Sequence, residues 1–391
     1  LACNKLGHVT HYIREEHISM SSEAAPAMAV AVDHEDTGSF SSGLEPGRLA
    51  RVKAAYTTRR IDLSRATALI SGDVAPRSGD LLLARVSRIR QHTRIELDNG
   101  RRARLHPGDE VLVCYGNRYA PDQFESLVPG DLGPCHLVAA GGVASLMNSR
   151  HKRMKAATEI TPIGLLGDST GRRINLRQAR IETPVAIGAR PYTLAVVGTS
   201  MNAGKTTSAA HLIKGLDHYG MRVGAAKITG TGSGGDVWFM FDSGADPVVD
   251  FTDAGHVSTY LASPRELEDI LTTLTSYLAA QDVDAIVLEI ADGIMQRETA
   301  ALLQSRLFKR LVDRVVFAAG DAMGAVAGAQ WMNERGLQVA ALSGALTASP
   351  LAIQEAERAT GVPVLDISQL SDPLVASSLV TADPTPVRAA L

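Results

Sequence analysis

The stretch that decides the fold reads Tyr192-Thr-Leu-Ala-Val-Val-Gly198-Thr-Ser-Met-Asn-Ala-Gly204-Lys205-Thr206-Thr207. Its first six residues are mostly apolar, which predicts a buried strand. Beyond Thr207, apolar residues recur at helical spacing until Gly220, which predicts a helix. A glycine-rich loop between a strand and a helix presents backbone N–H groups to phosphate oxygens at the positive end of the helix. The sequence therefore predicts a loop that binds the phosphates of a nucleotide.

Each residue type in this loop has a chemical role. Lys205 is expected to reach the β- and γ-phosphates, and the Thr206 hydroxyl to ligate Mg²⁺. The loop has five residues between its two glycines, one more than the strict GxxxxGK[ST] spacing. We expect nucleotide contacts from ten consecutive residues: Gly198, Thr199, Ser200, Met201, Asn202, Ala203, Gly204, Lys205, Thr206 and Thr207.

Two further strands end in charged residues. Residues 222–226 predict a strand that leads to Lys227, and residues 284–289 predict a buried strand that ends at Glu289. Ligands of open α/β sheets bind at the carboxyl ends of the strands. We therefore expect a polar site at these strand ends, with Lys205 and Glu289 among its catalytic residues.

A magnesium ion prefers oxygen ligands and keeps several waters. We expect its protein ligands to be Thr206, Asp236 and Glu289. Asp250 and Asp253 are alternative carboxylates, although loop aspartates often serve only to form turns.

Strands and helices alternate through the rest of the chain. Strands are predicted at 314–320, 337–342 and 362–366, and helices at 264–280 and 349–360. Ser263-Pro-Arg-Glu266 has the pattern of a capping box, which marks a helix start. This order predicts an α/β domain with a mainly parallel, doubly wound sheet over residues 191–391.

The phosphate loop resembles that of the dethiobiotin synthetase and cobyrinate amidase branch (SIMIBI class) of P-loop NTPases, over about residues 192–365. The resemblance is carried by the loop spacing and by the threonine after Gly198. It implies ATP and Mg²⁺ as cofactors, activation of a carboxylate or carbamate by phosphorylation, and a homodimer. Lys227 resembles a lysine of that branch that faces the reacting group, which implies that Lys227 is catalytic and stabilises phosphoryl charge. Glu289 also resembles a residue of that branch, but Glu-Ile-Ala-Asp-Gly stands here where the branch has Val-Glu-Gly-x-Gly.

In the N-terminal part of the chain, apolar residues recur at every second position. Alternating patterns at 81–89, 93–98, 102–105 and 110–115 predict short strands, and Asp98-Asn99-Gly100 predicts a hairpin turn. We expect a small antiparallel β-barrel over residues 48–147, followed by a connection with some strand content over 148–190. Residues 1–47 show no period and predict a flexible tail.

Charge is divided unevenly along the chain. Residues 48–190 carry 24 basic and 13 acidic side chains, whereas residues 191–391 carry 13 and 22. A basic barrel is a candidate for nucleic-acid binding, with Tyr56, Tyr115, Tyr119 and Phe124 available to stack on bases. Arginines that keep the barrel soluble or dock it on the acidic domain are the favoured alternative.

Composition sets the outer limits. A chain of 391 residues with 45% hydrophobic and 21% charged residues is a globular protein long enough for two domains. No apolar run reaches the roughly 18 residues of a membrane helix, which predicts no membrane partner. Three scattered cysteines predict neither a disulfide framework nor a CxxC metal site, and favour the cytoplasm.

Together these features predict a Mg²⁺-dependent, ATP-binding P-loop enzyme that activates a small molecule by phosphoryl transfer. One alternative is an N-acyltransferase of a small amino acid, because Asp250-Phe251 after such a loop resembles a P-loop family that contains D-glutamate N-acetyltransferases. A nucleic-acid-binding NTPase or a nucleotide-switched regulator is the alternative from a different class.

Overall fold

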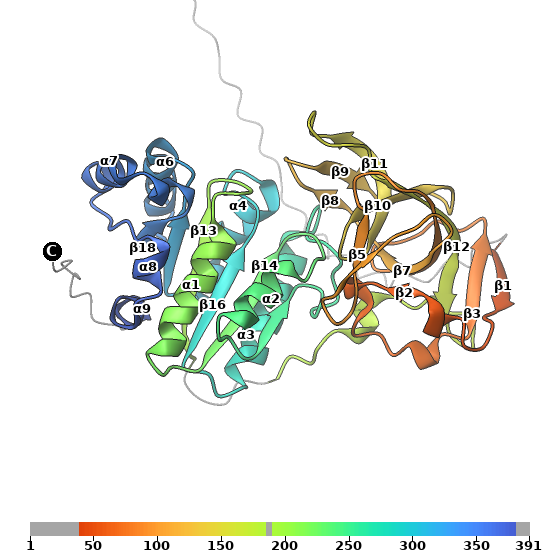
Figure 1. Cartoon of the computed structure of the whole chain (residues 1–391). Coiled ribbons are helices and arrows are strands. Elements are labelled where there is room, and N and C mark those ends of the chain that lie inside the picture. The colour runs from red at the N-terminus through yellow and green to blue at the C-terminus, as the bar shows by residue number, and fades with distance from the viewer. Residues whose placement is uncertain (1–38, 185–189, 381–391) are drawn as a thin grey trace, which may run out of the picture. The chain divides into compact units, whose positions relative to one another are not determined.

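The strand predicted at Tyr192 lies inside a six-stranded sheet in the computed structural model, which describes residues 39–184 and 190–380 (Figure 1). Every pairing in this sheet is parallel. The strand order is β15 (Val248–Asp250), β14 (Val223–Thr229), β16 (Ala285–Ile290), β13 (Tyr192–Gly198), β17 (Arg314–Ala318) and β18 (Val339–Ser343). The phosphate loop therefore follows a strand that has neighbours on both sides.

Two apolar clusters hold helices against this sheet. One contains side chains of α1 (Lys205–His218), α2 (Gly235–Asp242), α8 (Ile367–Leu370) and α9 (Pro373–Val380). The other contains side chains of α3 (Pro264–Ala279), α4 (Arg297–Gln304), α5 (Arg306–Leu311), α6 (Ala322–Glu334) and α7 (Pro350–Thr360). A parallel sheet buries both of its faces in this way, which is why its strands read as continuous apolar runs.

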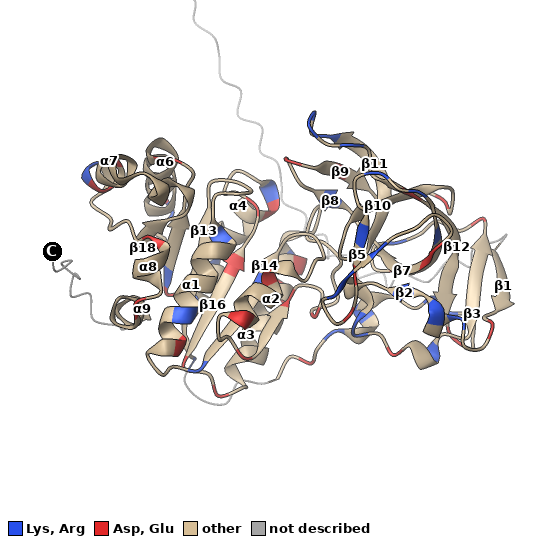
Figure 2. Cartoon of the chain, in the orientation of Figure 1, with Lys and Arg blue, Asp and Glu red and all other residues tan. Residues whose placement is uncertain are grey.

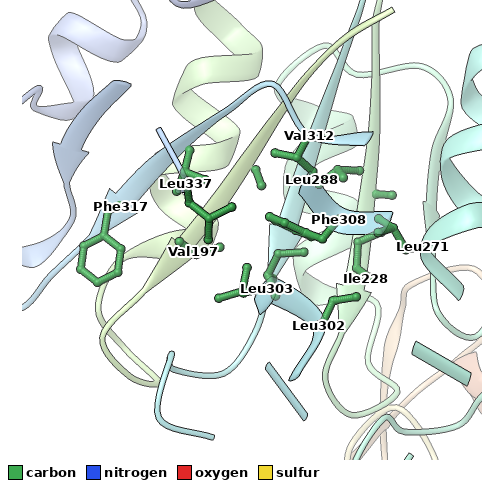
Figure 3. Close-up of a cluster of buried hydrophobic side chains, with 14 of the residues drawn as sticks. Val197, Ile228, Leu271, Leu288, Leu302, Leu303, Phe308, Val312, Phe317 and Leu337 are labelled. Atoms are coloured by element: carbon green, nitrogen blue, oxygen red, sulfur yellow. The ribbon is translucent and has the colours of Figure 1, made fainter. Parts of the chain in front are cut away.

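The second cluster is shown in Figure 3. Phe308 of α5 lies among Leu288 of β16, Ile228 of β14 and Leu271 of α3. Leu288, Ile228, Leu271 and Phe308 are all fully buried. Their packing fixes the strands whose carboxyl ends carry the polar residues described below.

The predicted elements of this region are largely confirmed. The capping box at Ser263 and Glu266 is present at the start of α3. The strand predicted at 362–366 is the exception, because Val364 forms only an isolated parallel bridge with Leu342.

Residues 39–167 form what we call the N-terminal β region. Its ten-stranded sheet contains β1 (Ser39–Gly43), β2 (Lys53–Ala54), β3 (Ala68–Gly72), β4 (Leu81–Arg88), β7 (Glu110–Tyr115), β8 (Arg118–Tyr119), β9 (Phe124–Leu127), β10 (Cys135–Ala139), β11 (Val143–Arg150) and β12 (Thr158–Gly167). A separate antiparallel pair joins β5 (Arg94–Glu96) to β6 (Arg102–Arg104), with Gly100 at a φ of 79° in the predicted turn.

Short 3₁₀ turns occur in both parts of the chain. They are η1 (Leu49–Arg51), η2 (Tyr56–Thr58), η3 (Leu63–Arg65), η4 (Leu176–Ala179) and η5 (Ala345–Ala348).

The strand pairings of the N-terminal β region close a ring. They run from β12 to β4, β7, β11 and β10 and return to β12. The pairing of β7 with β11 is parallel, so the arrangement is not wholly antiparallel as expected.

Two predicted boundaries differ from the structure. Strand β12 lies inside the residues expected to form a connection, yet it pairs with three strands of the sheet. Strand β1 lies inside the expected tail and pairs with β3; the rest of that tail, residues 1–38, lies outside the described residues. Some strand content was expected in residues 148–190, but the local pattern showed neither that β12 joins this sheet nor that β1 exists, because both strands depend on partners distant in sequence.

The described residues all belong to one compact unit. No helix among them is long and apolar enough to cross a membrane.

Candidate functional site

The phosphate loop ends at a glycine that begins α1. Gly204 has a φ of 98°, and a Cβ atom there would lie 2.8 Å from the Cα atom of Gly344. Only glycine suits this conformation and this close approach. No described side chain caps the first turn of α1, so its backbone N–H groups remain available to an anion.

Lys205 is buried directly after this glycine. It is 6% exposed, and its ammonium group donates a hydrogen bond to the carbonyl oxygen of Ser200 at 2.7 Å. Burial lowers the pKa of Lys205, whereas the charges of Glu289 and Asp292 act in the opposite direction. A cation is thus held against the loop at the point where phosphate charge would enter.

Thr206 and Glu289 meet across the sheet edge. The Thr206 hydroxyl donates to Glu289 Oε1 at 2.7 Å, and Glu289 is 2% exposed at the end of β16. Its other oxygen, Oε2, is buried and has no hydrogen-bond partner in the described part of the chain. A buried carboxylate with an unused oxygen beside a hydroxyl provides the donor set that Mg²⁺ prefers.

Asp236 has a different partner from the one predicted. Its carboxylate, in the first turn of α2, forms a close ion pair with the Lys227 ammonium group. Lys227 is 8% exposed, and a buried ammonium group requires an opposite charge nearby. Asp236 therefore neutralises Lys227, and within the described residues it forms no hydrogen bond or ion pair with Thr206 or Glu289.

One cavity brings most of the predicted residues together. Its volume is about 540 Å³, within the range of roughly 300–1,000 Å³ that is usual for small-molecule sites. Its wall includes Met201, Asn202, Gly204, Lys205, Thr206, Thr207, Lys227, Asp236 and Glu289. Gly198, Thr199, Ser200 and Ala203 belong to the loop but are not part of the wall.

The N-terminal β region also forms part of this wall, which the sequence did not indicate. Arg118, Tyr119, Ala120 and Gln123 line the cavity together with the phosphate loop. Nothing in the local pattern distinguishes Arg118 from the other arginines of its region, so the sequence offered no signal for it. A hydrogen bond from the Asn202 amide to the carboxylate of Asp122 joins the loop itself to this region.

Asp250 and Asp253 do not line the cavity. Asp250 is fully buried and accepts a hydrogen bond of 2.9 Å from the hydroxyl of Tyr56. Arg59 pairs with Asp253 at 2.6 Å and with Asp250 at 3.4 Å. These carboxylates, considered above as magnesium ligands, instead bind the N-terminal β region. The adjacent Phe251 is also fully buried, but it packs in the apolar core of the C-terminal sheet. Of the pair that suggested an acyltransferase, Asp250 therefore forms this contact.

Several arginines of the basic segment meet acidic residues of the C-terminal part. Besides Arg59, the pairs are Arg60 with Asp253, Arg177 with Glu266 and Arg180 with Asp269. Lysines and arginines recur through the N-terminal β region (Figure 2). These pairs confirm docking as one role of the basic segment. Three of the aromatic residues considered for base stacking, Tyr56, Tyr115 and Phe124, are buried.

No protein-family model matches the sequence, and no curated protein matches it. Three solved structures illustrate the likenesses that were found. Signal recognition particle receptor FtsY from Elizabethkingia anophelis in complex with GDP is 16% identical, with a TM-score of 0.35 over 50% of this chain and 66% of that one. Cell division protein FtsY from Thermotoga maritima is 16% identical, with a TM-score of 0.33 over 52% and 73%. Signal recognition particle 54 kDa protein from Aeropyrum pernix K1 in complex with GDP is 16% identical, with a TM-score of 0.36 over 49% and 45%.

At these TM-scores the likenesses establish neither a common fold nor a common ligand. None of the three is a dethiobiotin synthetase or a cobyrinate amidase, so they add no support to the resemblance with that branch.

Proposed function

We propose that this chain binds a nucleoside triphosphate with Mg²⁺ in the cavity and hydrolyses it. The observation that supports this most directly is the contact between Thr206 and Glu289 at the start of α1, beside Lys205. The uncapped helix end, the lysine and the carboxylate supply the three components that phosphate binding at such a loop requires. Both ATP and GTP serve as test nucleotides.

Magnesium fits the residues present. Thr206 and Glu289 would hold the ion, and the unpartnered Oε2 atom of Glu289 leaves one acceptor for it or for a bound water. When bound, the ion would neutralise charge on the phosphate oxygens. Lys205 and the N–H groups of the loop orient the phosphates, and the cavity wall limits the access of water.

A nucleotide-dependent switch is the finer function that the contacts favour. Asn202 of the phosphate loop bonds to Asp122, and the Gly234 N–H before α2 donates to Glu96 at 3.1 Å. Both acceptors belong to the N-terminal β region. Nucleotide binding at the loop would therefore act on contacts that hold this region, which is the arrangement a switch needs.

Phosphoryl transfer to a small molecule is the second candidate, supported by the size of the cavity and by Lys227 on its wall. The two candidates differ in their products. Phosphate release by the purified protein alone indicates hydrolysis, whereas turnover that requires an added small acid indicates transfer.

The test of nucleotide binding is Lys205→Ala. We expect turnover to fall by roughly a hundredfold or more, because a preorganised cation next to the phosphates is lost. Lys214→Ala, an exposed lysine on the same helix, is the matched control and should keep the parent's rate. Equal phosphate release by the Lys205 variant and the parent would remove the loop from the reaction.

A further inference from the structure

Arg118 is a buried cation with unused hydrogen-bond donors. It lies in β8, is 6% exposed, and donates one hydrogen bond, from Nη2 to Gln123 Oε1 at 2.8 Å. Its Nε and Nη1 atoms are buried without a hydrogen-bond partner in the described part of the chain. The guanidinium carbon lies 5.7 Å from the centre of the Phe124 ring. The side chain is thus held at a fixed position while two donor atoms remain free.

This arrangement is unfavourable for the free protein. Burial lowers the pKa of Arg118 to about 10, which still leaves it charged at neutral pH. Asp292 attracts it electrostatically, yet no described carboxylate forms an ion pair with it within 4.0 Å. A buried guanidinium group normally has its charge and its donors matched, and the fold gains nothing from leaving them unmatched.

The other two cations on the cavity wall have partners within the protein. Lys205 donates to the carbonyl oxygen of Ser200, and Lys227 pairs with Asp236. Arg118 lines the same cavity with its donors unused. Among these three cations it is therefore the one whose missing partner is best explained by a ligand.

We propose that Arg118, supplied by the N-terminal β region, binds an oxyanion in the cavity beside the phosphate loop. A planar guanidinium group with two free donors suits a phosphate or carboxylate, which it can bind in a bidentate manner. The inference rests on the proposed function, since it places this oxyanion in the nucleotide cavity. Its source is either the terminal phosphate of the nucleotide or the acid group of a second substrate.

The position of Arg118 at this wall does not follow from docking. Arg59, a half-buried arginine of the same region, is matched by two carboxylates outside the cavity. Gln123, which accepts the one hydrogen bond from Arg118, also lines the cavity. Arg118 and its supporting residue therefore face the space that the phosphate loop faces.

The experiment measures ligand affinities of the full-length protein by calorimetry. The variants are Arg118→Met, which removes the charge at similar volume, and Arg118→Lys, which keeps the charge but lacks the planar guanidinium group that can bind an oxyanion in a bidentate manner. Arg88→Met changes an exposed arginine on β4 and is the control. The probes are a non-hydrolysable ATP analogue, ADP, and inorganic phosphate titrated into the ADP-loaded protein, with the guanine nucleotides in parallel.

Two results support the proposal and identify the source. If Arg118 binds the terminal phosphate, R118M should lower the affinity for the triphosphate analogue by about tenfold or more and leave the affinity for the diphosphate unchanged. If it binds a second oxyanion, the analogue should bind as before, and phosphate binding to the ADP-loaded protein should weaken by a similar factor. In either case R118K should fall between R118M and the parent, and R88M should match the parent.

Unchanged affinity of R118M for all probes would overturn the proposal while leaving the proposed function intact. A parent protein that binds neither nucleotide series would instead overturn the proposed function, and the inference with it. The midpoint of thermal unfolding adds an independent measurement. Because R118M removes an unmatched buried charge, the ligand-free variant should unfold at a higher temperature than the parent; a lower midpoint with unchanged affinities indicates a structural role and also overturns the proposal.

Discussion

Arg59 and Arg118 of the N-terminal β region, the first half-buried and the second buried, have opposite surroundings. Arg59 meets Asp250 and Asp253, so its charge is matched outside the cavity. Arg118 meets only the uncharged Gln123 through a hydrogen bond, and two of its donor atoms are free. The ion pairs of Arg59 stabilise the contact with the C-terminal sheet. The free donors of Arg118 remain available to bind a ligand in the cavity. One region thus provides both the attachment and a residue for the site.

This difference shows why charge alone is a poor guide to function. Both arginines belong to a segment with 24 basic residues, and the sequence gives them no distinguishing pattern. They differ in what the fold places opposite them. Substitutions that remove one charge or the other therefore test the comparison directly.

The largest effect is expected from Arg59→Ala. It would leave Asp250, which is fully buried, without a guanidinium partner, and would leave Asp253, which is 3% exposed, with only the longer contact to Arg60. Loss of one member of a buried ion pair costs about 3–5 kcal/mol, so the free energy of unfolding measured with denaturant should fall by about that amount.

Arg60→Ala is the matched control for this prediction. Arg60 approaches the same Asp253 at 3.5 Å, but its side chain is 41% exposed. Exposed ion pairs contribute about 0–1 kcal/mol. Similar losses from the two substitutions would show that burial does not separate the roles of these arginines.

A smaller effect is expected from Glu289→Gln, which changes the cavity and not the contact between the two regions. The amide keeps the shape but loses the charge beside Thr206, so Mg²⁺-dependent turnover should fall by about a hundredfold, in the range seen when one electrostatic group is removed from a site. Nucleotide affinity should change much less, because the loop and Lys205 remain. Metal titrations of the rate provide the measurement.

Asp284→Asn controls for charge on the same segment. Asp284 precedes β16, at the end of the strand opposite Glu289, and accepts a hydrogen bond from the Arg222 N–H at 2.8 Å. Its rate and metal dependence should match the parent's. If the two variants have the same metal titration curve, Glu289 is not a ligand.

The C-terminal sheet was predictable because its signals are local. The strand before Gly198, the helix after Lys205 and the capping box at Ser263 each depend on residues close in sequence. Parallel strands joined by helices also repeat one pattern, and their carboxyl ends must meet at one edge. This is why the sequence predicts Lys227 and Glu289 close to the loop.

The N-terminal contribution was not predictable in the same way. Arg118 reaches the cavity only because β8 pairs with β9 and the chain then meets the loop at Asn202. Such contacts join residues about 80 positions apart, and no short-range period encodes them. Asp250 was misjudged for the same reason, because its partner Tyr56 lies 194 positions away.

The smallest effect is expected at Asp292, whose carboxyl group interacts electrostatically with charged residues of both regions. Burial raises the pKa of this carboxyl group, while Lys205, Lys227 and Arg118 act to lower it and Glu289 acts to raise it. A folded-state pKa above the unfolded value of about 3.9 means that folding favours the protonated form. Ionisation of Asp292 therefore destabilises the fold progressively as the pH rises from the unfolded pKa through the folded one.

Asp292→Asn removes that penalty, so the ligand-free variant should unfold a few degrees above the parent near neutral pH. It should match the parent in acid, where the parent's Asp292 is protonated in both states. Thermal scans between about pH 4 and pH 8 measure the difference, and Asp98→Asn in the exposed hairpin turn should show no such growth with pH. A stabilisation by Asp292→Asn that is constant across this range, or that shrinks toward neutral pH, would mean that the cations from the two regions compensate fully for the burial of this carboxyl group.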